Sequence, residues 1–231
     1  MTLENMENLT LNDFFSPVGL ENPTYVRNKV EFENVTRNMY GNKYDKLLEY
    51  LSKSDFYYAP AASKFHDNYP GGLYDHCKLL YQELLRTSSM IRNAWNKESL
   101  FLIAFCHDLC KIGLYKPEIV TTESGKKFVQ YGYNNLGYDD RISHGTKSLE
   151  IVGDIIPEYL DELIANCIVY HMGSYTKDAP GWSEVIKGND LIFFTHAADM
   201  VASRSGKVIQ SVEVGERSEE RRVGKECRSR W

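Results

Sequence analysis

Histidine and aspartate side chains recur in this 231-residue chain at positions where they could bind metal ions. The adjacent pair His107-Asp108 follows the most apolar stretch of the sequence, and Asp199 lies inside a second apolar string, LIFFTHAADMVAS. Imidazole together with carboxylate suits Mn, Fe, Zn, Ni or Co. Further histidines fall at the ends or on the faces of expected helices: His76, His144, His171 and His196. These residues are candidates for a transition-metal site.

The two aspartates need a positive charge nearby. A carboxylate in an apolar helix is costly to bury unless it is paired or bound to a cation, and the partial negative charge of a helix C-terminus adds to the cost for Asp108. No basic residue follows Asp199 before Arg204. Asp108 could pair with Lys111, three residues on, but that pairing leaves Asp199 unexplained. A divalent metal is the simplest source of charge for both, and Mg²⁺, which prefers oxygen ligands, is an option at one site.

A set of helices is expected to position these side chains. Residues 98–109 are apolar on nearly every side, which predicts a central, buried helix that ends near Gly113. Apolar spacing predicts further helices over residues 25–39, 47–51, 73–93, 143–154, 159–171 and 190–204. Ser143 and Asp190 are expected as N-caps. Residues 118–133 alternate β-formers around a turn at 123–126, which is typical of a hairpin. The expected fold class is therefore all-α, with one small β-hairpin.

The order His76 … His107-Asp108 … His144 … His171 … Asp199 resembles the H…HD…H…H…D signature of HD-domain metal-dependent phosphohydrolases. Four flanking strings resemble the same family: NYPGGLYDHCKLL, AFCHDLCKIG, ISHGTKSLEIV and HAADMVASR. The resemblance covers roughly residues 57–206. It looks nearest to the HD domain of bacterial 3′-5′ exoribonucleases, although the residues ahead of the motif lack the strand pattern of a barrel.

The resemblance implies an HD-domain helical bundle with a binuclear site, in which Asp108 bridges two divalent transition metals. It also implies the other ligands of the two ions: His76, His107 and Asp199 for one, and His144 and His171 for the other. The two ions would activate a shared hydroxide for attack on a phosphomonoester or phosphodiester. The implied protein is a metal-dependent phosphohydrolase whose substrate is a nucleotide or short oligonucleotide.

Two other side chains are assigned to the reaction or the substrate. Lys111 lies one turn beyond His107 and is expected to contact phosphate or support the site as a catalytic residue. Its alternative is a solvated lysine at a helix end. His196 shares a helix face with Asp199 and is expected either to line the site and bind substrate or to pack beside it.

Further residues near the motif have plainer interpretations. His66, in the loop before the first motif, could reach the mouth of the site. Cys106 and Cys110 are expected in the helix core, because their spacing with no other cysteine nearby is weak evidence for zinc. The tyrosines of the hairpin region either form a base-stacking lid or serve as ordinary packing: Tyr115, Tyr131, Tyr133 and Tyr138.

Three other functions stay open. A shorter H…HD…D ligand set on the same fold implies one metal and activity as a deoxynucleoside triphosphate triphosphohydrolase. The longer ligand set is also used by mixed-valent di-iron oxygenases of the HD fold. A binding module with a vestigial site is the third alternative, and the complete ligand set weighs against it.

The composition is that of an ordinary globular protein, 42% hydrophobic and 26% charged. The apolar runs are shorter than a membrane span and the acidic N-terminus does not resemble a signal peptide, so a cytoplasmic protein without a membrane partner is expected. The five cysteines show no disulfide framework. We divide the chain into an N-terminal arm with helices, residues 1–56, and the HD domain, residues 57–210. A homo-oligomer is left open.

The last fifteen residues, RSEERRVGKECRSRW, differ abruptly from what precedes them. They resemble a translated sequencing-adapter oligonucleotide, so residues 217–231 are interpreted as a non-native tail and the source as metagenomic. The tail holds six basic and three acidic residues, which leaves 21 basic and 29 acidic residues and a net charge of −8 in the rest of the chain. An acidic body argues against long duplex nucleic acid as a partner.

Overall fold

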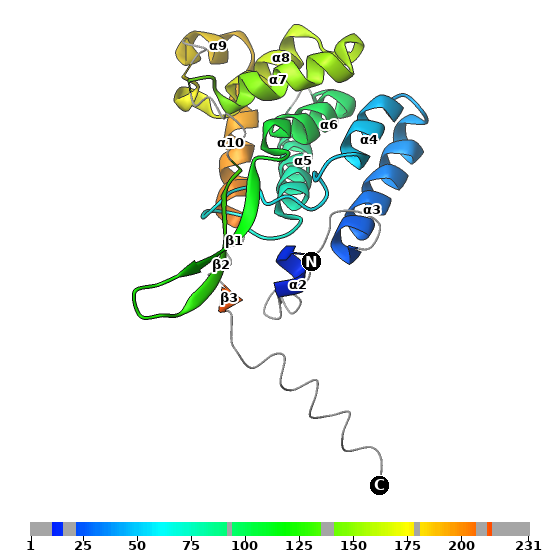
Figure 1. Cartoon of the computed structure of the whole chain (residues 1–231). Helices are drawn as coiled ribbons and strands as arrows, with labels where there is room; N and C mark the ends of the chain where they lie inside the picture. The colour runs from blue at the N-terminus through cyan, green and yellow to red at the C-terminus, as the bar shows by residue number, and fades with distance from the viewer. Residues whose placement is uncertain are drawn as a thin grey trace.

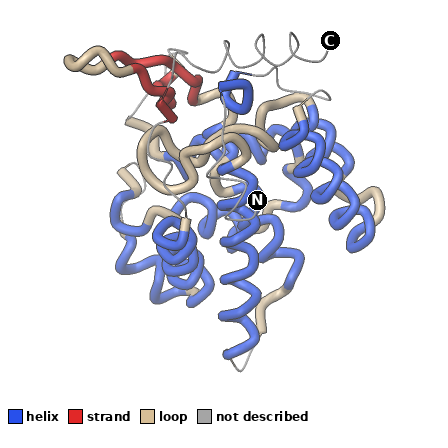
Figure 2. The backbone as a smooth tube through the Cα atoms, turned by 90° about the horizontal axis from the view of Figure 1, so that it is seen from below, coloured by secondary structure: helices blue, strands red, loops and turns tan. Residues whose placement is uncertain are grey.

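The computed structural model describes residues 11–15, 22–91, 94–134, 141–177, 181–206 and 212–213. Across these ranges the chain is mostly helical, with one small antiparallel sheet (Figures 1 and 2). The expected all-α fold with a small hairpin is confirmed. The tail of residues 217–231 and Tyr138 lie outside the described ranges.

The α-helices of these ranges are α2 (Leu11–Phe15), α3 (Pro23–Tyr40), α4 (Asp45–Ser52), α5 (Gly72–Met90), α6 (Lys97–Cys106), α7 (His144–Ile155), α8 (Glu162–Tyr170), α9 (Trp182–Gly188) and α10 (Asp190–Ser205). Short 3-10 helices are η1 (Leu109–Lys111), η2 (Pro157–Tyr159) and η3 (Gly173–Tyr175). The strands are β1 (Tyr115–Thr121), β2 (Lys127–Tyr133) and β3 (Val212–Glu213).

Helices α5, α6 and α10 form the centre of the molecule, where α5 contacts both of the others. Helix α8 contacts α6, α7 and α10 and so closes one end of this centre. Figure 1 shows α3 and α4 on the outer side of the central helices α5 and α6. The β1–β2 hairpin points away from the helices. Within the described ranges, no helix is both long enough and apolar enough to cross a membrane.

Helix α6 is buried on every side, as its composition predicts. Every residue from 100 to 106 is buried, and the Asn96 side chain caps the first turn by accepting a hydrogen bond from the backbone N–H of Glu98. The expected end near Gly113 is wrong, because the helix stops at Cys106. Asp108 adopts φ −117° and ψ 21°, outside the helical region, so it lies in a turn that leads into η1.

The helix starts follow the capping residues. The Ser143 side chain accepts a hydrogen bond from the first turn of α7, as expected. The prediction of Asp190 as a cap is wrong, because its neighbour Asn189 caps α10 and Asp190 is the first helical residue. Helix α8 begins at Glu162, later than expected, because Asp161 is its cap. Helix α9 was not anticipated by the apolar spacing, and none of its residues is buried.

Aromatic side chains join α3 to the central helices. Phe32 of α3 is 2% exposed. Its ring centroid lies 4.5 Å from that of Phe105 and 5.7 Å from that of Phe101, both on α6. Phe56 and Tyr74 pack against the same ring. The N-terminal helices therefore share one apolar core with α5 and α6, and the domain boundary at residue 56 stays a prediction.

The hairpin forms where the alternating residues predict it. Strands β1 and β2 pair antiparallel, with Tyr115 opposite Tyr133, and β3 pairs with the other side of β2. Tyr131 is buried, with its ring centroid 5.8 Å from that of Phe14 in α2. Tyr131 is therefore a packing residue, whereas Tyr115 and Tyr133 lie at the base of the hairpin, beside the candidate ligands described next.

Candidate metal centre

Five of the six candidate ligands converge from the central helices. His76 comes from α5 and Asp199 from α10, while His107, Asp108 and His171 directly follow the ends of α6 and α8. All five are buried, with exposed fractions of 7% or less. They meet because α5 packs against α6 and α10, and α8 packs against the same two helices.

The first group of ligands faces inward at close range. His76 Nε2 lies 3.3 Å from His107 Nε2 and 3.1 Å from Asp199 Oδ1. Asp108 Oδ2 lies 3.2 Å from His107 Nε2 and 3.6 Å from His76 Nε2. His76, His107 and Asp108 each offer a ligand atom within 4.8 Å of the other two. These buried groups could hold a metal ion.

Backbone carbonyls determine which ring nitrogen of two histidines carries the hydrogen. His107 Nδ1 donates to the carbonyl oxygen of Ala104 at 2.9 Å, and His171 Nδ1 donates to that of Ile168 at 2.7 Å. A carbonyl oxygen can only accept, so in the neutral rings Nε2 carries a lone pair. Both Nε2 atoms face the carboxylate of Asp108. Only a proton or a cation between them removes the repulsion of the lone pairs.

Lys111 is buried beside Asp108. Its Nζ atom lies 2.7 Å from Asp108 Oδ2 and the residue is 7% exposed, so the alternative of a solvated lysine is wrong. Burial alone would raise the pKa of Asp108, but Lys111 and His107 outweigh it and hold that pKa well below its usual value. Burial is likewise outweighed at Asp199, whose pKa is lowered by its hydrogen bond from His76. Lys111 balances one of the two buried carboxylates, and a proton on His107 or a bound metal ion would balance the other.

Three buried side-chain atoms of the site have no hydrogen-bond partner among the described residues: Asp108 Oδ1, His171 Nε2 and His76 Nδ1. The first two face each other at 3.7 Å. Burial and the neighbouring His107 lower the pKa of His171 to about 4, so its ring is neutral near pH 7. A buried polar atom without a partner costs about 1–3 kcal/mol. A cation between these atoms relieves that cost, so the donor set fits a divalent transition metal.

His144 approaches Asp108 as the first residue of α7. A ring nitrogen of His144, a carboxylate oxygen of Asp108 and Cys110 Sγ all lie within 4.8 Å of one another. Burial lowers the pKa of His144, which favours the neutral ring that a metal ligand requires. The site thus contains two groups that could hold metal ions, and they share Asp108.

Four of the six candidate ligands, His144 among them, line the floor of an open cavity, here called the metal pocket, with a volume of about 370 Å³. Asp108, His171 and Asp199 line it together with Lys111. His196 lines it as well, while its Nδ1 atom donates to the His171 carbonyl oxygen at 2.8 Å. His196 therefore packs beside a candidate ligand and also lines the cavity, and its binding of substrate stays a prediction.

The loop before α5 holds one residue that the sequence analysis considered, His66, and one that it missed, Asp67. His66 lines the metal pocket, with its ring centroid 5.1 Å from that of His76. Asp67 is buried, and its Oδ2 atom lies 3.9 Å from His76 Nδ1, behind the ligand. Asp67 adopts φ +50°, a conformation that Asp tolerates better than most residues. The pair Asp67-Asn68 is the sequence signal of this turn, because both residue types favour turns.

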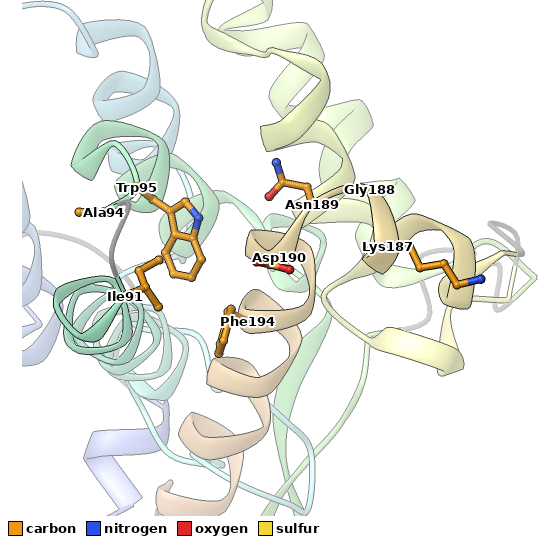
Figure 3. A pocket seen from close by; sticks show the side chains of 8 residues that line it. All are labelled: Ile91, Ala94, Trp95, Lys187, Gly188, Asn189, Asp190 and Phe194. Carbon is orange, nitrogen blue, oxygen red and sulfur yellow. The ribbon is translucent and has the colours of Figure 1, made fainter.

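A separate groove of about 690 Å³ lies at the N-terminal end of α10 (Figure 3). Trp95 and Phe194 line it with their ring centroids 5.4 Å apart, and Asn189 lies at its edge. None of the six candidate ligands lines this groove. The chemistry-bearing residues therefore gather at the metal pocket, farther along α10.

No family model, curated protein or solved structure matches the chain. Membership of a family is therefore a proposal, and the buried histidines and carboxylates of the metal pocket support it. The candidate ligands, their burial and their unpaired lone pairs are observed directly in the structure of this chain, without support from a relative.

Proposed function

We propose that the chain is an HD-type metal-dependent phosphohydrolase that binds two divalent transition-metal ions. The observation that carries the proposal is the pair of candidate metal groups that share the buried Asp108. A single ion beside His76 and His107 would leave His171 Nε2 facing a carboxylate oxygen without a partner. A second ion on the far side of Asp108 supplies that partner.

The ligands divide between the two ions as follows: His76, His107, Asp108 and Asp199 for the first, and Asp108, His144 and His171 for the second. When bound, the ions supply Lewis acidity toward the phosphoryl oxygens and a nucleophile at neutral pH. Lys111 holds the Asp108 carboxylate in place at 2.7 Å. Because Lys111 also lines the pocket, its positive charge attracts a phosphate group toward the floor.

Exposed aromatic side chains favour a nucleotide or short oligonucleotide as the substrate. Phe65, Tyr133 and Tyr175 line the metal pocket with exposed fractions of 71%, 54% and 74%. Aromatic faces stack on bases with about 1–3 kcal/mol per base. A second cavity of about 350 Å³ shares Tyr133, His144 and Tyr175 with the first. The two halves of a diester therefore have room on either side of His144.

The test is turnover by protein loaded with Mn²⁺, Ni²⁺ or Fe²⁺. The substrates are bis(p-nitrophenyl) phosphate, cyclic nucleotides, dinucleotides and deoxynucleoside triphosphates. We expect hydrolysis of at least one diester, its loss on chelation, and background rates in Asp108→Ala. No turnover on any substrate, or turnover that consumes O₂ with bound di-iron, would contradict the proposal.

Tyr175→Ala tests the stacking of a base at the rim. We expect kcat/KM for a dinucleotide to fall roughly tenfold, equivalent to about 1–2 kcal/mol of lost stacking. An abasic diester should be hydrolysed at the unchanged rate. Met90→Ala is the matched control, because Met90 is 72% exposed at the end of α5 and does not line the pocket. Equal losses on both substrates would contradict stacking by Tyr175.

A further inference from the structure

The cysteine two residues after Asp108 faces the metal centre. The geometry points to Cys110 as a thiolate ligand of the second ion, on the His144 side of Asp108. This inference rests on the proposed two-metal site and assigns to that site a sulfur donor that the H…HD…H…H…D motif does not contain. It also corrects the expectation that Cys110 belongs to the helix core.

The position of the sulfur carries the inference. Cys110 Sγ lies within 4.8 Å of ligand atoms of both Asp108 and His144, which themselves lie that close together. An ion among these three atoms would have a sulfur, a nitrogen and an oxygen donor. Asp108 Oδ1 is buried and has no hydrogen-bond partner among the described residues, so a carboxylate oxygen with unused lone pairs already points to a cation here.

Helix α7 holds the thiol in place. The buried Ser148 hydroxyl accepts a hydrogen bond from the backbone N–H of Cys110 at 3.2 Å and also hydrogen-bonds its side chain. Ser148 follows His144 by four residues, so both lie on the same face of α7. One helix face thus presents the imidazole and the hydroxyl that positions the sulfur.

The other described cysteines have a different environment. Cys77, Cys106 and Cys167 are members of the apolar core cluster, each at most 1% exposed. Cys110 is not a member of that cluster and is partly exposed. Apolar packing accounts for the thiols of the three core cysteines. It does not account for Cys110, whose position beside Asp108 and His144 fits a metal ligand.

A sulfur ligand changes which metal the second position prefers. Thiolate is soft and favours Zn²⁺ or Fe²⁺ over Mn²⁺ and Mg²⁺, so Mn²⁺ is expected to fill this position only at saturating concentration. Binding would form one sulfur–metal bond and release the thiol proton to solvent, so the thiol and the histidine would bind the ion with a net loss of one proton. The first position has nitrogen and oxygen donors only, so the two positions are expected to differ in metal preference.

Titration of the metal-free protein with Co²⁺, with thiols kept reduced, tests the ligand by absorption spectroscopy. A Co²⁺–thiolate bond gives a sulfur-to-metal charge-transfer band in the near ultraviolet, whereas nitrogen and oxygen ligands do not. We expect two equivalents of Co²⁺ to bind, and the band to accompany one of them. Cys110→Ser should abolish the band, and Cys106→Ala, four residues earlier, should keep it.

If Cys110→Ser does not fold, Cys110→Ala replaces it, and circular dichroism reports the folding of each variant. Two bound equivalents without the band, or a band that persists in folded Cys110→Ser, would overturn the sulfur ligand and leave the proposed function standing. No binding of Co²⁺ would overturn both.

Discussion

Two histidines of the metal centre are anchored by the same local device. His107 and His171 each occupy the position directly after a helix, α6 and α8, and each donates Nδ1–H to the carbonyl oxygen three residues earlier. This bond holds the ring and directs Nε2 toward Asp108. A carbonyl partner on Nδ1 also raises the basicity of Nε2 as a ligand. The Nε2 lone pairs of His107 and His171 are therefore already oriented toward Asp108 in the metal-free protein.

Lys111→Met should destabilise the metal-free protein, because Asp108 would stay buried without the cation that lies 2.7 Å away. We expect the free energy of unfolding to fall by about 3 kcal/mol and Mn²⁺ to restore part of the loss. Urea denaturation with and without Mn²⁺ measures both effects. Lys46→Met is the control, because it breaks an exposed pair with Glu158 and should change stability little. Equal losses in the two variants would contradict the buried pair.

At the scale of single residues, the sequence predicts the buried histidines and aspartates of the cluster better than it predicts the residues around them. Histidine and aspartate beside apolar stretches can be recognised from residue type, because their burial needs a compensating charge. The places of Cys110 and Asp67 depend on backbone dihedral angles, at the break after α6 and at the positive φ before α5. Spacing along a regular helix carries no information about such turns.

The elements bring the two halves of the centre together through one close approach. Gly145, the second residue of α7, lies so near α8 that a Cβ atom would overlap the carbonyl oxygens of Ile168 and Val169. Ile168 is the residue whose carbonyl anchors His171. The absence of a side chain at Gly145 therefore sets the distance between the start of α7, with His144, and the end of α8.

Gly145→Ala should separate α7 from α8 and weaken the second ion site. We expect calorimetric titration with Mn²⁺ to give one ion per chain in place of two, and overpacking to cost about 1–3 kcal/mol of stability. Gly153→Ala on the same helix is the matched control, since a Cβ atom there meets open space. It should keep both ions and raise stability by up to about 1 kcal/mol. Two ions in Gly145→Ala would show that the close approach is unnecessary.

Element types were predictable, and element ends less so. The apolar segment 98–109 carries no periodic signal that could mark its end, and the helix stops at Cys106, ahead of the turn at Asp108. Asn189 and Asp190 are both good capping residues, and local spacing alone does not choose between them. Helix α9 packs against the core only through the partly buried Trp182, Val185 and Ile186, and a pattern of three apolar residues in a seven-residue helix is short enough to be missed.

At the scale of the whole molecule, the aromatic core packs against α6, the helix that leads into the candidate metal centre. Phe32 of α3 contacts Phe101 and Phe105, and α6 then leads directly into His107-Asp108. The N-terminal helices thus stabilise the helix from which the HD pair projects. This long-range packing could not be read from the sequence, because apolar spacing along α3 does not show which helix it packs against.

Phe32→Ala should destabilise the whole fold, because it opens a cavity against α6. We expect the free energy of unfolding to fall by about 3–5 kcal/mol, measured by chemical denaturation. Val35→Ala on the same helix serves as the control, since Val35 is 46% exposed and should change stability little. A small effect of Phe32→Ala would mean that α3 contributes little to the core.

Anomalous X-ray diffraction from crystals of the Mn²⁺-loaded protein tests the two-metal centre most directly. We expect two anomalous peaks about 3.5–4 Å apart, one on each side of the Asp108 carboxylate. The ligands expected around them are His76, His107 and Asp199 at one peak, and His144 and His171 at the other. A single peak, peaks outside the metal pocket, or none at all would contradict the two-metal centre.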